Sequence, residues 1–184
     1  MGSLRREVGF WAAVGRLRLR DLLTVEIAGG AVIGSAASIL LVRNTNLAAR
    51  QDLAGDYLSL TPALLGVVFA ALALVVALMS DAYLQQLRGT SGGVLAFLSP
   101  FMVVIGLQVG TILAVVGYRA FSGLATAQAE HWLFGVITVL FAVSTLEVVA
   151  LARNVLMHGL ARGRLEQVTN LSAERESRQK RSAT

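Results

Sequence analysis

The stretch "PALLGVVFAALALVVALM" at residues 62–79 decides the fold, because it contains no polar side chain. The hydrocarbon core of a bilayer is about 30 Å thick, which about 20 helical residues span at a rise of 1.5 Å each. A helix without polar side chains can face lipid around most of its circumference, so this stretch predicts a transmembrane helix. Ser59, Thr61 and Pro62 favour a helix start, and they predict that this helix begins near residue 62.

Three further apolar stretches meet or approach this length, which gives four spans at about 27–42, 62–79, 94–116 and 132–152. The composition agrees, since 55% of the 184 residues are hydrophobic and the mean hydropathy is +0.68. That is too apolar for a soluble domain of this length. We therefore predict an all-α integral membrane protein with a four-transmembrane-helix bundle. The first span could instead be a signal-peptide core, but about 26 residues precede it and no clean cleavage site follows.

The spans divide the chain into three parts. Residues 1–26 form a basic cytoplasmic segment, residues 27–158 form the membrane domain, and residues 159–184 form a basic cytoplasmic tail. The tail has few apolar residues and mixed charge, which predicts a frayed helix that passes partly into disorder. The loops expected at 43–59 and 117–131 are too short for a folded external domain.

The segment 1–26 has the pattern of an amphipathic helix lying on the membrane surface. At about 100° per residue, its apolar side chains fall on one side and most of its basic side chains on the other. The basic side consists of Arg5, Arg6, Arg16 and Arg20. Arg18 falls on the apolar side, and a simple basic stretch that sets topology explains the pattern equally well.

The distribution of charge indicates topology rather than nucleic-acid binding, although the net charge is +5 and the isoelectric point is near 10.7. Basic residues gather at the two ends of the chain and are scarce between the apolar runs. Thirteen of the sixteen Lys and Arg residues fall on the side of the two termini. The positive-inside rule therefore predicts a multi-pass protein of the cell membrane with both termini in the cytoplasm, against an anionic inner leaflet.

Small residues recur at helix-packing spacing in two spans. The first span carries Gly30, Gly34 and Ser38, and the third carries Gly106 and Gly110. Such stripes let helix backbones approach closely, which drives association where lipid offers no hydrophobic gain. We expect them to pack against other helices of the chain or of a second subunit.

The third span also has a polar face. Gln108 and Thr111 project roughly 160° and 140° away from Gly110 and Gly106, respectively. A buried amide needs a partner or water in the membrane. Either this helix is central in the bundle, or one of its faces meets another subunit, which favours a homo-oligomer or a complex with another membrane protein.

A carboxylate, Glu147, lies inside the fourth span and shares a stripe with Ser144. An ionised carboxylate in hydrocarbon costs at least ~2.5–3.5 kcal/mol, so we expect it to face the bundle. A possible ion or proton site therefore includes Glu147, Ser144, Ser99, Gln108 and Thr111. The alternative is a structural carboxylate that bonds a neighbouring serine or reaches toward the membrane surface.

Nothing in the sequence indicates an enzyme, a cofactor or a metal site. There is no cysteine, and the two histidines, His131 and His158, lie roughly 40 Å apart along one predicted helix. The sequence lacks the nucleophile, zinc and phosphate-loop motifs of common enzyme classes. We expect a non-enzymatic oligomeric subunit with a possible ion- or proton-conducting or exchanging role. The alternative is a membrane-anchored interaction or regulatory protein that recruits a partner through its basic ends.

The charge distribution generates a prediction of topology. A reporter that works in the cytoplasm should be active when it is fused after Thr184, and a reporter that works only outside should be inactive. The reason is that the positive-inside rule places both termini in the cytoplasm. Paired cytoplasmic and external reporters in intact cells measure this. Activity of the external reporter alone would contradict the four-span topology.

Overall fold

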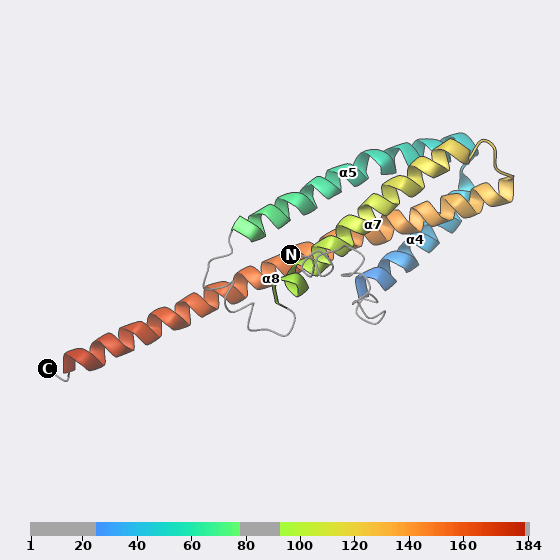
Figure 1. Cartoon of the computed structure of the whole chain (residues 1–184). Coiled ribbons are helices and arrows are strands. Elements are labelled where there is room, and N and C mark those ends of the chain that lie inside the picture. The colour runs from blue at the N-terminus through green and yellow to red at the C-terminus, as the bar shows by residue number, and fades with distance from the viewer. Residues whose placement is uncertain (1–24, 78–92, 183–184) are drawn as a thin grey trace, which may run out of the picture. The chain divides into compact units, whose positions relative to one another are not determined.

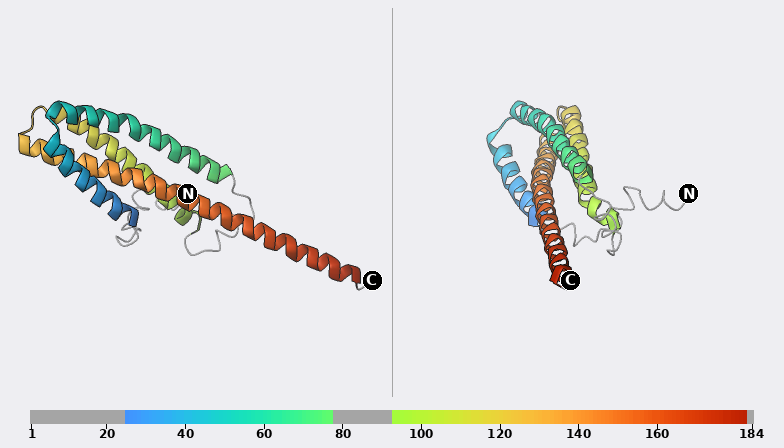
Figure 2. Two further views of the ribbon diagram at one scale, coloured as in Figure 1. Left: turned by 180° about the vertical axis from the view of Figure 1, so that it is seen from behind. Right: turned by 90° about the vertical axis from the view of Figure 1, so that its left-hand side faces the viewer.

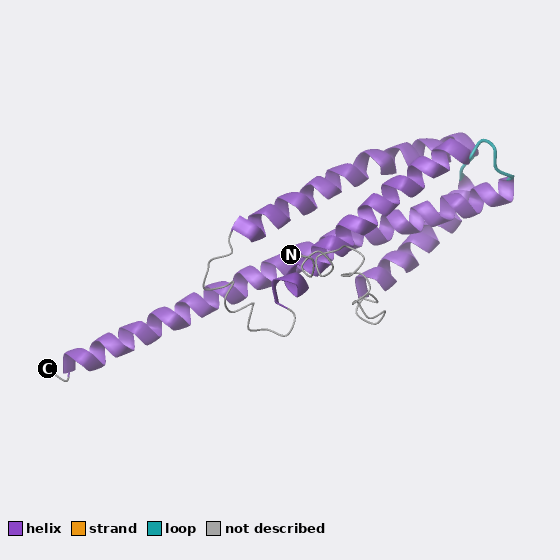
Figure 3. Ribbon diagram, in the orientation of Figure 1, coloured by secondary structure: helices purple, strands orange, loops and turns teal. Residues whose placement is uncertain are grey.

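The computed structural model describes residues 25–77 and 93–182, which are helical except at two short connections (Figure 3). The helices are α4 (Val25–Asn44), α5 (Leu47–Ala77), α7 (Gly93–Phe121) and α8 (Ala127–Ser182) (Figure 1). The surface helix expected within residues 1–26 falls almost wholly outside the described residues, and so do its basic side chains. These are Arg5, Arg6, Arg16 and Arg20.

The predicted fold class is confirmed, because four long apolar helices pack as a bundle and each is long and apolar enough to cross a membrane. Many large apolar side chains remain exposed on these helices, including Val67, Phe69 and Leu74 of α5. A surface of this kind requires an apolar solvent. The chain is therefore a four-span helical membrane protein whose helices contact lipid.

Helix α5 begins at Leu47 rather than near residue 62, because Asn46 provides the cap. The Asn46 Oδ1 atom accepts a hydrogen bond from the Ala49 amide at 2.9 Å. Pro62 lies inside the helix, so the expected helix start at this residue is wrong. The hydroxyl groups of Ser59 and Thr61 donate to backbone carbonyls of the preceding turn, which is another use of the residue types that also cap helices.

Helices α7 and α8 also extend into the region expected to be a loop. Thr126 caps α8, since its hydroxyl oxygen accepts from the Ala129 amide at 3.4 Å and its carbonyl accepts from the Glu130 amide. Only residues 122–126 connect the two helices. We call this end, where α4 joins α5 and α7 joins α8, the hairpin end, and the end at which α4 begins the terminal end.

Helix α8 is the central helix of the bundle, as the right-hand view of Figure 2 shows with α8 between α4 and α7. Of the apolar windows in the four helices, that of α8 is the most buried at 44% and that of α5 the least at 11%. One of the two expectations for the third span, α7, was that it is the central helix. The structure gives that position to α8 instead. Helix α7 packs side by side with α5.

Helix α7 buries one continuous face against the bundle. Its buried residues alternate at spacings of three and four, which is the spacing of coiled-coil packing. They are Phe101, Val104, Gln108, Thr111, Val115 and Tyr118. Gly110 is exposed on the other side, and a Cβ atom there would meet no described atom within 4 Å. Any packing through Gly110 must therefore involve atoms outside the described part of this chain.

Two contacts fix the antiparallel register of α7 and α8. Gln108 bonds the Ser144 carbonyl, and the Tyr118 and Phe134 rings lie 5.8 Å apart between centroids. Both pairs belong to one antiparallel register, because the numbers of the two residues in each pair add up to the same value. This register also pairs Val115 with Ile137, and both belong to the same buried apolar cluster.

The stripe of Gly30, Gly34 and Ser38 lies buried against α8. A Cβ atom on Gly30 would lie 2.7 Å from the Cα atom of Val143, and one on Gly34 would lie 2.7 Å from that of Val139. The absence of side chains thus lets the two backbones touch, as in other small-residue helix pairs. These contacts also define one antiparallel register for α4 and α8.

Helix α8 continues through the tail to Ser182. After Gly163 the sequence contains no Gly or Pro and is rich in Ala, Arg, Glu, Gln and Leu, which favour helix. Residues 152–184 form a compact unit separate from residues 1–151. The helix is therefore continuous in sequence across the boundary between the two units.

The α4–α8 contact generates a prediction about stability. Gly34→Ala should lower the free energy of unfolding by about 1–3 kcal/mol, because the new methyl group meets backbone atoms that cannot turn away. Gly66→Ala on exposed α5 is the matched control, since nothing described lies within 4 Å of a Cβ there. Thermal unfolding of the purified protein in detergent measures both. Equal stability of the two variants would contradict the close α4–α8 contact.

Candidate functional site

The middle of the bundle contains a buried polar layer. The Gln108 side chain is fully buried, and its Nε2 atom donates a hydrogen bond to the backbone carbonyl of Ser144 at 3.1 Å. Ser144 and Thr111 are also fully buried. The structure thus brings three of the predicted site residues, Gln108, Thr111 and Ser144, into the interior of the bundle.

The Gln108 side chain retains an unused acceptor. Its Oε1 atom is buried and has no hydrogen-bond partner among the described residues. The amide orientation is fixed, because the Ser144 carbonyl can accept but not donate and must face the nitrogen. The nearby hydroxyl groups do not serve Oε1, since Thr111 and Ser144 donate within their own helices to the carbonyls of Leu107 and Phe141. A buried acceptor of this kind favours uptake of a donor such as water.

Glu147 lies one helical turn from Ser144 toward the terminal end, and its side chain is only 8% exposed. In the α7–α8 register it is level with Ile105, about 4.5 Å along the axis from the level of Gln108. Ser99, which is half-buried, lies about 9 Å further along α7 from Ile105. The structure therefore places Glu147 nearer in depth to Gln108 than to Ser99.

A second carboxylate, Glu26, lies at the same level as Glu147. The contacts between Gly30 and Val143, Gly34 and Val139, and Ser38 and Gly135 all belong to one antiparallel register. One turn further toward the terminal end, this register pairs Glu26 with Glu147. Each residue is spaced by four from the contact residues of its own helix, so both lie on the facing sides of α4 and α8.

The hairpin end contains a buried ion pair. The Arg50 guanidinium makes two parallel hydrogen bonds to the Glu130 carboxylate, with Nε to Oε1 at 3.0 Å and Nη2 to Oε2 at 2.7 Å. The Tyr118 hydroxyl donates to Glu130 Oε1 at 2.6 Å. Arg50 and Glu130 are 5% and 3% exposed. This cluster joins the ends of α5, α7 and α8 through charge-assisted bonds.

The remaining polar groups at the hairpin end complete the cluster. Arg50 also donates from Nη1 to the Thr45 carbonyl, and Gln51 donates to the Ser122 hydroxyl at 2.9 Å. Glu130 occupies the first turn of α8, where a negative charge is favourable. Arg50 occupies the first turn of α5, where a positive charge is unfavourable, so its carboxylate partner compensates both its burial and its position.

An apolar layer separates the ion pair from the polar layer. It consists of Ala54 from α5, Val115 from α7, and Phe134 and Ile137 from α8. All four side chains are at most 2% exposed. The layer is not wholly apolar, because Thr138 is buried next to Ile137 and the Tyr57 side chain interacts with it.

Sequence reasoning missed the ion pair and Glu26. Arg50, Tyr118 and Glu130 were assigned to solvated loops, because polar residues just beyond an apolar run look the same in a loop and in an extended helix. A signal was present: Asn46 and Thr126 are capping residue types, and each precedes a charged residue by four positions. Glu26 could have been found from the i, i+4, i+8 stripe that begins one turn later at Gly30.

The comparisons with known proteins identify no family for this chain. It matches no protein-family model, no curated protein and no solved structure. Among the described residues, no three His, Asp or Glu side chains gather as metal ligands. The fold and the polar layers thus define the class, a four-span helical membrane protein with buried polar groups.

The ion pair generates a prediction about stability. Arg50→Met or Glu130→Leu alone should lower the free energy of unfolding by about 3–5 kcal/mol, because each leaves an uncompensated buried charge. The double variant should be much less destabilised than the sum of the single variants. Asp52→Asn, an exposed carboxylate in the same turn as Arg50, is the control. Additive effects in denaturant unfolding would show that the two charges do not interact.

Proposed function

We propose that this chain is a non-enzymatic membrane subunit that takes up a proton or a small cation at the level of Glu26 and Glu147. The proposal is carried by the α4–α8 register, which sets two carboxylates on facing sides of two touching helices. Carboxylate oxygens are hard ligands, so two that face each other can hold a small cation or a proton between them. Intramembrane carboxylates commonly serve ion and proton movement.

The buried Gln108 acceptor supports the same proposal. Its Oε1 atom lies about one turn along the bundle from the level of Glu147, and it would accept a hydrogen bond from a water that accompanies the ion. Between Gln108 and the ion pair the buried side chains are mostly apolar, which favours an occluded exchange site over an open pore.

The proposed subunit assembles with a further membrane subunit, either a second copy or another protein. The support is the face of α7 that carries Gly106 and Gly110, since Gly110 is exposed and has open space around it. A small-residue face of this kind favours close helix contact between subunits. With both termini in the cytoplasm, as the basic ends favour, the carboxylate level lies toward the cytoplasmic side.

A second candidate function is partner recruitment by the tail. It is favoured by the continuation of α8 as a helix through Ser182, in a compact unit of its own. The chain from Arg153 onward carries seven basic and three acidic residues. In that case the spans serve as an anchor, and the carboxylates have a structural role.

Ion flux into liposomes tests the first candidate. In proteoliposomes with an internal pH-sensitive dye, Glu147→Gln and Glu26→Gln should each reduce proton or cation-coupled flux at least about tenfold, because neither amide can take up a charge. Expression and detergent-solubilised size should stay normal. Asp56→Asn, an exposed carboxylate of α5 near the hairpin end, should leave the flux unchanged.

Two outcomes separate the candidates. Wild-type flux no greater than that of empty liposomes, or full flux in both glutamine variants, would contradict the ion-handling role. Removal of residues 163–184 should leave the flux intact under the first candidate. Loss of cellular function on this removal, with the membrane domain still folded, would favour partner recruitment.

A further inference from the structure

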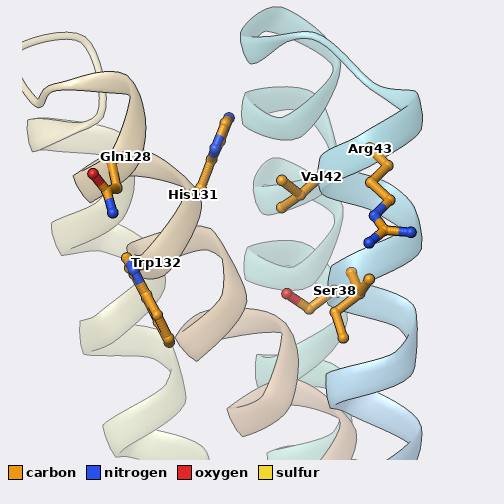
Figure 4. Close-up of a pocket in the computed structure, with 7 residues that line it drawn as sticks. Ser38, Val42, Arg43, Gln128, His131 and Trp132 are labelled. Atoms are coloured by element: carbon orange, nitrogen blue, oxygen red, sulfur yellow. The ribbon is translucent and has the colours of Figure 1, made fainter.

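An open groove lies between α4 and α8 at the hairpin end, with a volume of about 280 Å³ (Figure 4). Its floor is at Ser38, whose hydroxyl oxygen would lie 3.0 Å from a Cβ atom on Gly135. At this level small residues let the two helices touch. One turn further toward the hairpin end, the α4–α8 register pairs Val42 with His131, and these larger side chains separate the helices. The groove is thus a direct consequence of where the small-residue stripe ends.

The groove has an apolar wall. Ile39 and Val42 of α4 and Trp132 of α8 line it, and Ile39 and Trp132 are 54% and 72% exposed. These side chains belong to helices that contact lipid, so water is excluded from this wall. An apolar groove at membrane depth is filled by acyl chains unless protein covers it. A tryptophan near a helix end is typical of the headgroup level of a bilayer.

The opposite end of the groove has a polar rim. Arg43, on the last turn of α4, and Gln128 and His131, on the first turns of α8, line this end (Figure 4). Arg43 is exposed and makes no ion pair or side-chain hydrogen bond with any described residue. The Glu130 carboxylate, which precedes His131 in the chain, is already engaged by Arg50 and Tyr118, although His131 Nε2 lies 3.7 Å from it. The rim therefore presents an uncommitted guanidinium together with the further hydrogen-bond donors of Gln128 and His131.

We propose that this groove is a binding site for an anionic phospholipid. The phosphate lies at the rim, where the Arg43 guanidinium donates charge-assisted hydrogen bonds and Gln128 and His131 supply further donors. One acyl chain lies along Ile39, Val42 and Trp132 down to Ser38. The combination of an acyl-chain wall with an Arg at the headgroup level selects a lipid over free phosphate, which would leave the wall without a partner.

Native mass spectrometry of the full chain, loaded with equal amounts of phosphatidylglycerol and phosphatidylcholine, tests the proposal. The wild-type protein should retain phosphatidylglycerol in preference. Arg43→Gln should lower the ratio of the two retained lipids about fivefold, through loss of a charge-assisted hydrogen bond at an exposed site. Arg119→Gln, which removes an exposed arginine near the same end outside the groove, is the control and should not change the ratio. Ile39→Trp should reduce retention of both lipids by filling the groove.

Three results would overturn the proposal. The first is an equal ratio in the Arg43 and Arg119 variants, and the second is unchanged lipid retention in Ile39→Trp. The third comes from disulfide crosslinking. Because the chain contains no cysteine, a disulfide can form only at the single cysteine that is introduced. If Ile39→Cys forms disulfide-linked dimers in membranes far more readily than Val67→Cys on exposed α5, a second copy of the chain occupies the groove.

Discussion

The arrangement of the bundle depends on the ion pair between Arg50 and Glu130. Separating these charges would leave a buried ion without compensation, so the pair resists sliding or parting of the ends of α5 and α8. The Tyr118 hydroxyl of α7 donates a hydrogen bond to the same carboxylate, so α7 is held at this level too. With three helices held at one level, the register of everything toward the terminal end follows, because helices advance by a constant 1.5 Å per residue. The apolar layer of Val115 and Ile137 and the bond from Gln108 to Ser144 lie in this register.

A second constraint, the contact of bare backbones at Gly30 and Gly34, sets the position of α4. The two constraints act on different faces of α8. The Glu147 side chain projects from α8 in a direction between these two faces. It is spaced by three from Ser144, which meets α7, and by four from Val143, which meets α4. This explains why a carboxylate inside an apolar span is buried within the bundle rather than turned to lipid. It also explains how Glu26, at the start of α4, reaches the same level.

The sequence predicted the four spans well, because an unbroken apolar run has few structural alternatives. Helix boundaries were predicted poorly at the hairpin end, where Pro62 was interpreted as a helix start although Asn46 provides the cap. That error placed Arg50 in a loop and concealed the ion pair. Gln108, Ser144 and Glu147 were found from their rarity in apolar surroundings. Their relative depths were not, because depth depends on the pairing of α7 with α8, and pairing is a property of contacts rather than of periodicity.

The proposed site and the proposed lipid groove lie at opposite ends of the same α4–α8 contact, and its geometry connects them. Small residues hold the helices together between Gly30 and Ser38, so the backbones there act as a rigid segment. A ligand that pushes α4 away from α8 at the level of Val42 and His131 would tend to rotate α4 about this segment. The other end of α4, at Glu26, would then move toward α8. A lipid that occupies the groove therefore limits the positions of α4, and through it the separation of the two carboxylates. Any coupling between the proposed lipid and the proposed ion would have to pass through this contact, because Gly30 to Ser38 is the segment of α4 between the two sites.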